Sequence, residues 1–215
     1  MKNVVQERAI ESFVKDRDIT TLVHFTRIEN LSSIFSNGLL PIDSLSQRRL
    51  NYINNDEYRL DNCLDANCVS IQFPNYQMFY KYRDKNQDID WVVLGIKKKI
   101  LWEKDCAFCV ENAASGKVVS MPLDQRKGVD ALKRLYYEYP GKPTRNELNL
   151  KSSIPTHPQA EVLVFDKIEP ELIWGVAFVS EEKLNQYSYL VPSTVRPSVE
   201  PWLYSYRHDF EHWRL

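Results

Sequence analysis

One carboxylate in the chain stands where it could do chemistry. Glu161 follows Gln159-Ala160 and opens an apolar run, 162–165, with the length and composition of a buried strand. A carboxylate at the mouth of such a strand can be partly desolvated and held in place, which suits it to stabilise positive charge or to accept a proton. A glutamate at a strand edge that makes a surface salt bridge is the alternative for the same pattern.

A second polar group lies near the start of the chain, on a short apolar strand over residues 21–26. Successive side chains alternate across a strand, so His24 and Thr26 lie on the same face. Asn30 follows at the start of an amphipathic segment. A histidine between apolar residues is commonly a structural one, so this strand alone leaves its role open.

Hydrophobic periodicity predicts the elements that must position these groups. We expect an N-terminal helix within residues 1–18 and further helices over about 28–36, 76–84, 129–138 and 181–187, with Asn37-Gly38 ending the second. We expect strands at 21–26, 67–73, 91–96, 107–110, 161–166 and 173–179. The sheet is then assembled from non-adjacent pieces of a single α+β domain that spans 1–215.

Two stretches carry little predicted regular structure. Residues 41–66 are polar and form a loop region with a little helix. Residues 112–157 contain several prolines and one central helix but no predicted strand, and they end just before Glu161. Long polar loops in compact domains are commonly functional.

Composition limits the possible partners. The chain has 28 basic and 29 acidic side chains, for a net charge of −1, which argues against an extended non-specific grip on duplex nucleic acid. With only 6 glycines and no G-x-G-x-x-G pattern, a Rossmann-type NAD site is disfavoured. No apolar run is long enough to cross a bilayer, so we expect a cytoplasmic protein without membrane contact.

Metal binding is not expected. The cysteines at 63, 68, 106 and 109 have C-x4-C and C-x2-C spacings, but neither turn has the glycines typical of a zinc knuckle. Free thiols in a reducing compartment are the favoured interpretation. His208 and His212 are spaced as on one helix face but lack further ligands nearby, so we expect surface residues.

The order and spacing of the motifs resemble those of the DarT family of DNA ADP-ribosyltransferase toxins, over roughly residues 20 to 180. The matching positions are His24, Thr26, Asn30, Gly38-Leu39-Leu40, Arg59, Asn75 and Gln159-Ala160-Glu161. The resemblance implies an ADP-ribosyltransferase-like split β-sheet core with peripheral helices and a long insertion before the strand of the catalytic glutamate. It implies NAD as co-substrate and single-stranded DNA as acceptor.

The resemblance also assigns roles. Glu161 is the catalytic carboxylate, which stabilises the positive charge that develops on the ribose when the bond to nicotinamide breaks. Arg59 is the candidate guanidinium for the pyrophosphate and for catalysis, with Arg48 and Arg49 as rivals. The resemblance also gives five NAD contacts, which come from the first motif, the polar loop and the segment after the second expected strand: His24, Thr26, Asn30, Arg59 and Asn75.

Acceptor contacts are expected from the insertion 112–157, which matches in position the acceptor-facing loop of ADP-ribosyltransferases. The candidates there and at the adjoining helix are Tyr76, Asn112, Ser115, Arg126 and Arg145. Aromatic and basic residues mix in two clusters, 76–83 and 126–137, as they do where bases stack. Buried aromatics with solvated charges would give the same pattern.

Three kinds of function remain open. The first is transfer of ADP-ribose from NAD to a base of single-stranded DNA, with guanine favoured by the 105–109 and 112–115 stretches. The protein would then act as the toxin of a toxin-antitoxin or phage-defence system, with a DarG-like macrodomain protein as antitoxin. The second is transfer to protein, RNA or water. The third is a catalytically inactive nucleotide-binding module.

Overall fold

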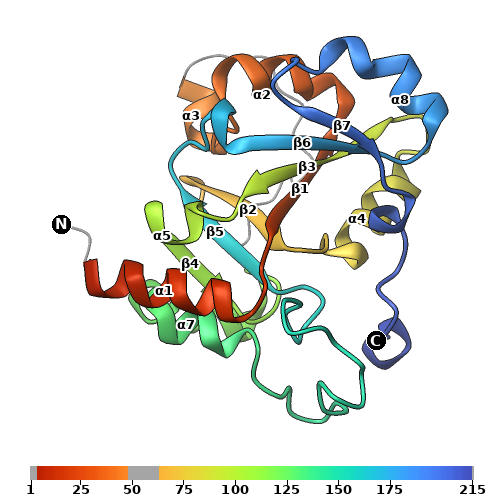
Figure 1. The fold of residues 1–215 in the computed structure, drawn as a ribbon. Coiled ribbons are helices and arrows are strands. Elements are labelled where there is room, and N and C mark those ends of the chain that lie inside the picture. The colour runs from red at the N-terminus through yellow and green to blue at the C-terminus, as the bar shows by residue number, and fades with distance from the viewer. Residues whose placement is uncertain (1–3, 48–62, 215) are drawn as a thin grey trace.

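The computed structural model describes residues 4–47 and 63–214, and within them seven strands form one sheet in the order β4-β5-β2-β1-β3-β6-β7 (Figure 1). The strands are β1 (Thr21–Arg27), β2 (Ala66–Ile71), β3 (Trp91–Lys97), β4 (Cys106–Cys109), β5 (Glu161–Phe165), β6 (Ile173–Phe178) and β7 (Arg196–Val199). All neighbouring pairs are antiparallel except β6 and β7. The α+β class and the assembly of the sheet from non-adjacent segments are confirmed.

Short helices surround the sheet. They are α1 (Val4–Asp16), α2 (Leu31–Asn37), α3 (Ile42–Gln47), α4 (Tyr76–Lys85), α5 (Ile100–Glu103), α6 (Gly116–Val119), α7 (Gly128–Arg134) and α8 (Glu181–Tyr187). The amphipathic α1 buries Ile10 and Val14 and lies beside α5 and α7 (Figure 1). None of the helices in the described ranges is both long and apolar enough to cross a bilayer.

The sheet is split between β1 and β2. These strands pair only at Leu22 with Ile71 and at Val23 with Ser70, whereas β1 pairs with β3 along its whole length. At the closed end, Gln72 turns the chain with φ 66°, and its side-chain oxygen accepts from the backbone N–H groups of Thr20 and Thr21 at 3.0 and 2.8 Å. The expected split-sheet core is therefore present.

An aromatic cluster holds the C-terminal part of the chain to the sheet. Phe25 of β1 stacks on Phe79 of α4 with ring centroids 4.6 Å apart, and Phe79 also packs on Tyr204 at 5.3 Å. The buried Tyr204 hydroxyl donates to the carbonyls of Trp91 and Ala177 at 3.0 and 2.8 Å. These bonds attach the segment after β7, residues 200–214, to the same side of the sheet as α4.

The structure differs from the predicted elements at a few places. β7 was not predicted because Pro197 discourages a strand, but β7 lies at the sheet edge, where proline is tolerated. The helix expected over 129–138 ends at Arg134, and the one expected from residue 28 starts as a 3-10 turn over Ile28–Asn30 before α2 begins. The insertion 112–157 has no strand, as expected.

Gly38 is required by backbone geometry. It ends α2 at φ 87°, and a Cβ at this position would lie 2.6 Å from the carbonyl oxygen of Ile168. Leu39, the next residue, exchanges two backbone hydrogen bonds with Ile168, so the clash cannot relax easily.

We expect Gly38→Ala to destabilise the protein by about 1–3 kcal/mol, because the new side chain combines an unfavourable φ with a backbone clash. Gly116→Ala is the matched control, because a Cβ there meets nothing within 4 Å and alanine favours the helix. Urea unfolding of both variants measures the difference. A Gly38→Ala variant as stable as Gly116→Ala would contradict this account.

Candidate active site

Glu161, the first residue of β5, is the centre of the candidate site. Its side chain is only 5 % exposed, and both carboxylate oxygens accept hydrogen bonds. Oε1 accepts from Nδ2 of Asn75 at 3.0 Å, and Oε2 accepts from the backbone N–H of Ala113 at 2.9 Å. A buried carboxylate needs such donors, so the salt-bridged surface glutamate that the sequence left open is not what forms.

Asn75 links this carboxylate to helix α4. Its side-chain oxygen accepts from the N–H of Met78 and so caps the helix, while its side-chain nitrogen donates to Glu161. Its own N–H donates to the Ser70 hydroxyl at 3.3 Å. Since each end of the amide has a partner of the opposite kind, the orientation of the Asn75 side chain is fixed by its surroundings.

The turn after β4 supplies the second donor. Asn112 Oδ1 accepts from Ala114 N–H at 2.9 Å, and Ser115 Oγ caps α6 by accepting from Val118 N–H at 3.2 Å. These bonds shape the turn so that the Ala113 N–H faces Glu161. Asn112 and Ser115 were predicted as acceptor contacts. In the structure their side-chain oxygens accept from the backbone of this turn and so stabilise the site.

Cys109 lies directly opposite Glu161 in the β4–β5 pair. Burial, followed by the charge of Glu161, raises the pKa of this thiol to about 12, so it stays protonated. Arg126, from the 3-10 turn before α7, lies near the thiol and is 7 % exposed, with Nε and Nη1 buried and without a hydrogen-bond partner. This buried position does not support the predicted contact of Arg126 with DNA phosphate.

His24 bridges the two halves of the split sheet. Its Nδ1 lies 2.8 Å from the carbonyl oxygen of Cys68 on β2. A carbonyl only accepts, so Nδ1 carries a proton and donates to it. Cys68 pairs with Leu163, two residues along β5 from Glu161, so the imidazole lies at the strands that carry the carboxylate.

Thr26 and Asn30 form a pair of their own. The Asn30 amide donates to the Thr26 hydroxyl at 3.1 Å, and Thr26 is only 3 % exposed. Asn30 also lies within a continuous helical turn and makes no side-chain cap bond to α2. Asn30 thus lies at the start of α2 and beside Thr26, as expected, and its contact with NAD stays a prediction.

The C-terminal segment anchors the end of the insertion. The Arg207 guanidinium donates to the carbonyls of Pro155 and Thr156 at 2.9 and 2.8 Å and pairs with Asp209 at 2.5 Å. Burial acts to raise the pKa of Asp209, but the bonds from Arg207 and Trp213 outweigh it and hold the pKa below its ordinary value. This buried pair fixes the chain just before the strand of Glu161.

His157 is packed into the same junction. Its ring lies 4.7 Å from that of Trp213 and 4.9 Å from that of Tyr139, and its Nδ1 accepts from the Gln159 N–H at 3.1 Å. The Tyr139 hydroxyl donates to Glu111, near the turn that holds Ala113. Burial lowers the pKa of His157 to about 4, so the ring is neutral at physiological pH.

The two other predicted acceptor contacts are engaged within the protein. The half-buried Arg145 donates to the carbonyls of Ile154 and Lys151 and to the Thr156 hydroxyl, all within 2.9 Å, which ties the insertion together. Tyr76 is 4 % exposed, with its hydroxyl buried, and its ring packs on Tyr206. The buried position of Tyr76 does not support a direct contact with DNA.

The predicted catalytic arginine, Arg59, and its rivals Arg48 and Arg49 lie outside the described residues. None of the four cysteines, Cys63, Cys68, Cys106 and Cys109, is joined in a disulfide. Within 4–47 and 63–214, no group of three or more His, Cys, Asp or Glu side chains is arranged to hold a metal ion.

Sequence reasoning missed the parts of the site that are not motif-like. Ala113 acts through its backbone N–H, and an alanine gives no sign of this. A second group lies in the aromatic C-terminal segment: Arg207, Asp209 and Trp213, spaced by two and four residues. This spacing matches no known motif. Their role depends on contacts with residues 155–157, which the sequence does not reveal.

We expect Asn75→Asp to reduce activity by about 100-fold or more at neutral pH, because it replaces a donor to Glu161 with a second carboxylate and forces one of the two to take a proton. Aspartate still caps α4, so the loss of stability should be small. Ser180→Ala, which removes the cap of the distant α8, controls for the loss of a helix cap. Unchanged kcat in Asn75→Asp would remove Asn75 from the site.

His157 should make stability depend on pH. Its pKa is about 4 in the folded state and about 6.5 when unfolded, so between these values only the unfolded chain takes up the proton. Stability is therefore full above pH 6.5 and falls as pH drops toward 4. We expect His157→Asn to flatten this fall by up to about 1.4 kcal/mol per pH unit, whereas the exposed His212→Asn leaves it unchanged. Thermal unfolding across this pH range measures both.

Comparison with known proteins places the chain in a family. The family described as "ssDNA thymidine ADP-ribosyltransferase, DarT" matches residues 23–207. No curated protein sequence gives a significant match.

Solved structures share the fold. Thermosipho africanus DarTG in complex with ADP-ribose aligns with TM-score 0.60 and 15 % identity over 86 % of this chain, which spans about half (51 %) of that longer chain. Thermus sp. 2.9 DarT aligns in complex with NAD+ (TM-score 0.54, 16 % identity, 87 % of this chain and 98 % of that one) and with ADP-ribosylated ssDNA (TM-score 0.51, 16 % identity, 87 % and 97 %). The sequence match covers most of the chain and includes both halves of the split sheet, so the protein belongs to the DarT family.

Proposed function

We propose that this protein transfers ADP-ribose from NAD to a base of single-stranded DNA and releases nicotinamide. The observation that carries the proposal is the buried Glu161 carboxylate, held at both oxygens by donors from two distant segments. A carboxylate fixed in this way is suited to stabilise a positive charge that appears only during reaction. Membership of the DarT family, with relatives solved with NAD+ and with ADP-ribosylated ssDNA, supports the same activity.

The reaction breaks the bond between C1′ of the nicotinamide ribose and the pyridinium nitrogen. The electron pair leaves with nicotinamide, and C1′ becomes electron-deficient. A nitrogen of the acceptor base then forms the new bond to C1′ and loses a proton. We assign two tasks to Glu161: it stabilises the ribose cation and accepts that proton. The bonds from Asn75 and Ala113 hold its carboxylate in place for both.

Binding of NAD is assigned to the split between β1 and β2. His24, whose ring is oriented by the bond from Nδ1 to the Cys68 carbonyl, is proposed to contact the ribose and nicotinamide portions of NAD. Asn30 bonds Thr26, and Asn75 bonds Glu161. These two hydrogen bonds fix the three side chains that we propose as further NAD contacts. Arg59 is proposed for the pyrophosphate, because a guanidinium bonds two phosphate oxygens at once.

The acceptor base is the least constrained part of the proposal. The sequence favoured guanine, whereas the family description names thymidine, so thymidine is the base we propose and guanine is the alternative. The insertion 112–157 is the proposed acceptor-facing wall, since its first turn and its last residues both adjoin Glu161. Single strands are preferred because a paired base must first be unstacked.

A toxin role is part of the same proposal. A DarTG chain carries more than a domain of this length, which is consistent with a macrodomain antitoxin as partner. A cytoplasmic location, where NAD and DNA occur together, fits this role. Transfer to protein or RNA is the second candidate, and the net charge of −1 is the observation that favours it.

We expect Glu161→Ala to abolish nicotinamide release and transfer while NAD affinity stays close to that of the wild type, because the carboxylate acts on charge absent from the ground state. Glu171→Ala, at a glutamate in the turn before β6, is the control and should keep full activity. Expression of the wild type should arrest bacterial growth, and the Glu161→Ala variant should not. A wild type that releases no nicotinamide would favour a binding module instead.

Acceptor choice is tested with NAD labelled in the adenylate. We expect label on single-stranded oligonucleotides and little on the matching duplexes, because extrusion of a paired base costs roughly a few kcal/mol. Nuclease digestion and mass spectrometry then distinguish modified thymidine from modified guanosine. Label found on protein or RNA alone would move the assignment to the second candidate.

A further inference from the structure

Exposed aromatic rings gather beside the candidate site. Of the exposed aromatic side chains in the described ranges, Tyr80, Trp202 and Tyr206 lie within one connected group of rings and are 46 %, 51 % and 46 % exposed. Tyr80 comes from α4 and the other two come from the C-terminal segment. An exposed group of large rings is unusual on a solvated surface and commonly marks a binding site.

Buried rings hold the exposed ones in place. Phe73 lies 5.8 Å from Trp202, and the buried Tyr76 meets Tyr206 edge-on at 5.7 Å. Tyr206 also packs on Tyr80 at 5.3 Å and stacks on Phe210 at 5.0 Å. Because this packing already fixes the rings, they lose little conformational freedom when a ligand stacks on them.

The group of rings adjoins the catalytic carboxylate. Tyr76 directly follows Asn75, whose amide bonds Glu161, and Gln77 donates to the Trp213 carbonyl at 3.1 Å. A strand with one base at Glu161 would pass over the start of α4 to reach Tyr206 and Trp202. The rings are therefore placed to meet nucleotides next to the acceptor rather than the acceptor itself.

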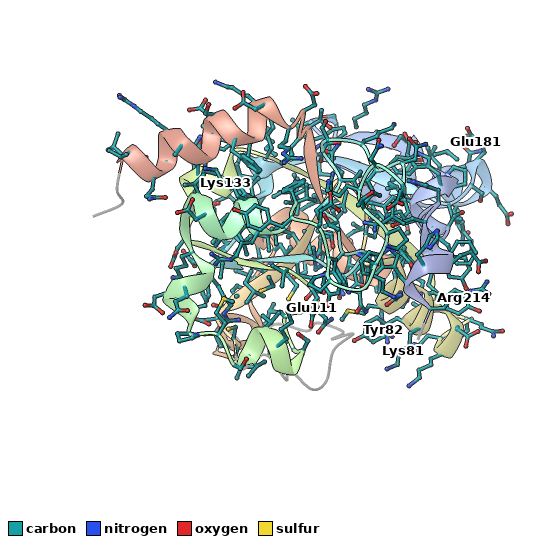
Figure 2. The ribbon with its side chains drawn as sticks, turned by 90° about the horizontal axis from the view of Figure 1, so that it is seen from below. Lys81, Tyr82, Glu111, Lys133, Glu181 and Arg214 are labelled. Atoms are coloured by element: carbon teal, nitrogen blue, oxygen red, sulfur yellow. The ribbon has the colours of Figure 1, made fainter. Side chains whose placement is uncertain are left out.

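Charge is divided across this surface. Lys81 and Lys85 lie on α4, and Arg214 lies over the Phe210 ring at 5.1 Å. Lys81 and Arg214 lie on the same side of the molecule (Figure 2). On the C-terminal segment, Glu200 bonds the Trp202 indole and Glu211 pairs with Arg214. Phosphates would be attracted along α4 and repelled by Glu200, which leaves the rings of the C-terminal segment for bases.

We infer that Tyr80, Trp202 and Tyr206 form a stacking surface for the bases that flank the acceptor nucleotide in single-stranded DNA. This inference rests on the proposed function. Stacking tolerates any base, since every base has a π face, so the surface would bind the strand without reading its sequence. It would also supply affinity that a chain of net charge −1 cannot obtain from phosphate contacts alone.

Oligonucleotide length provides the test. For a strand of about twelve nucleotides with one acceptor base, Trp202→Ala and Tyr80→Ala should raise KM about 5- to 100-fold, and for a strand of about four nucleotides they should change it little. Tyr189→Ala, at a tyrosine that is 78 % exposed on the turn after α8, is the matched control and should leave both KM values unchanged. Equal KM values for variants and wild type on the long strand would overturn the inference.

Abasic substitution separates stacking from charge. Removing a flanking base while keeping its phosphate should weaken binding to the wild type. It should not weaken binding to the Trp202→Ala variant, because that variant has already lost the indole on which the base would stack. Binding is followed by the fluorescence anisotropy of a dye-labelled oligonucleotide, with Glu161→Ala in both proteins so that no turnover occurs. Additive losses from the two changes would overturn the inference.

The outcomes are distinct from failure of the proposed function. A wild type that modifies no oligonucleotide of any length refutes DNA transfer itself. If the wild type modifies DNA but Trp202→Ala changes only its sedimentation, the surface joins protein chains and the stacking assignment is wrong. Melting temperatures of Trp202→Ala and Tyr80→Ala close to that of the wild type confirm that the variants are folded.

Discussion

The buried Glu161 carboxylate sets the main constraint on this structure. A carboxylate that is 5 % exposed must receive hydrogen bonds, and among the described residues two donors come from positions 75 and 113, which lie 86 and 48 positions away in sequence. Helix α4, the turn after β4 and strand β5 must therefore all be in place before the site exists. Loss of any one of them would leave a buried charge short of a donor, which ties the stability of these elements to the chemistry.

The split sheet makes room for this arrangement. Gln72 closes one end of the β1–β2 pair, and beyond Val23 the strands diverge, so the Cys68 carbonyl is met by the His24 imidazole instead of a backbone N–H. A side chain then occupies a position that a regular sheet would give to main chain. An imidazole ring therefore lies between the two halves of the sheet, at a position where a regular ladder has no space for a side chain.

The sequence predicted the elements and the carboxylate better than the surroundings of the site. Strand β5 and helix α4 follow from hydrophobic periodicity, Glu161 follows from its place at the start of β5, and Asn75 came from the family resemblance. Arg145 and Arg126 were expected to face DNA because the insertion 112–157 matches in position the acceptor-facing loop of ADP-ribosyltransferases. Arg145 instead bonds the carbonyls of its own insertion, a need that arises because 112–157 has no sheet or long helix to satisfy its backbone. The edge strand β7 escaped prediction since Pro197 is disfavoured in every strand except one at an edge.

The C-terminal segment connects the two tasks of the protein. Its buried Arg207–Asp209 pair holds residues 155 and 156, and its Tyr204 hydroxyl contacts β3 and β6, so one stretch of chain connects the insertion to the half of the sheet that contains β1, β3 and β6. The same stretch presents Trp202 and Tyr206 to solvent. A base stacked on these rings would favour the docked state of the segment and thereby the placement of the insertion beside Glu161. Binding of the strand and assembly of the acceptor wall would then be coupled, since a ligand stabilises whichever arrangement it contacts best.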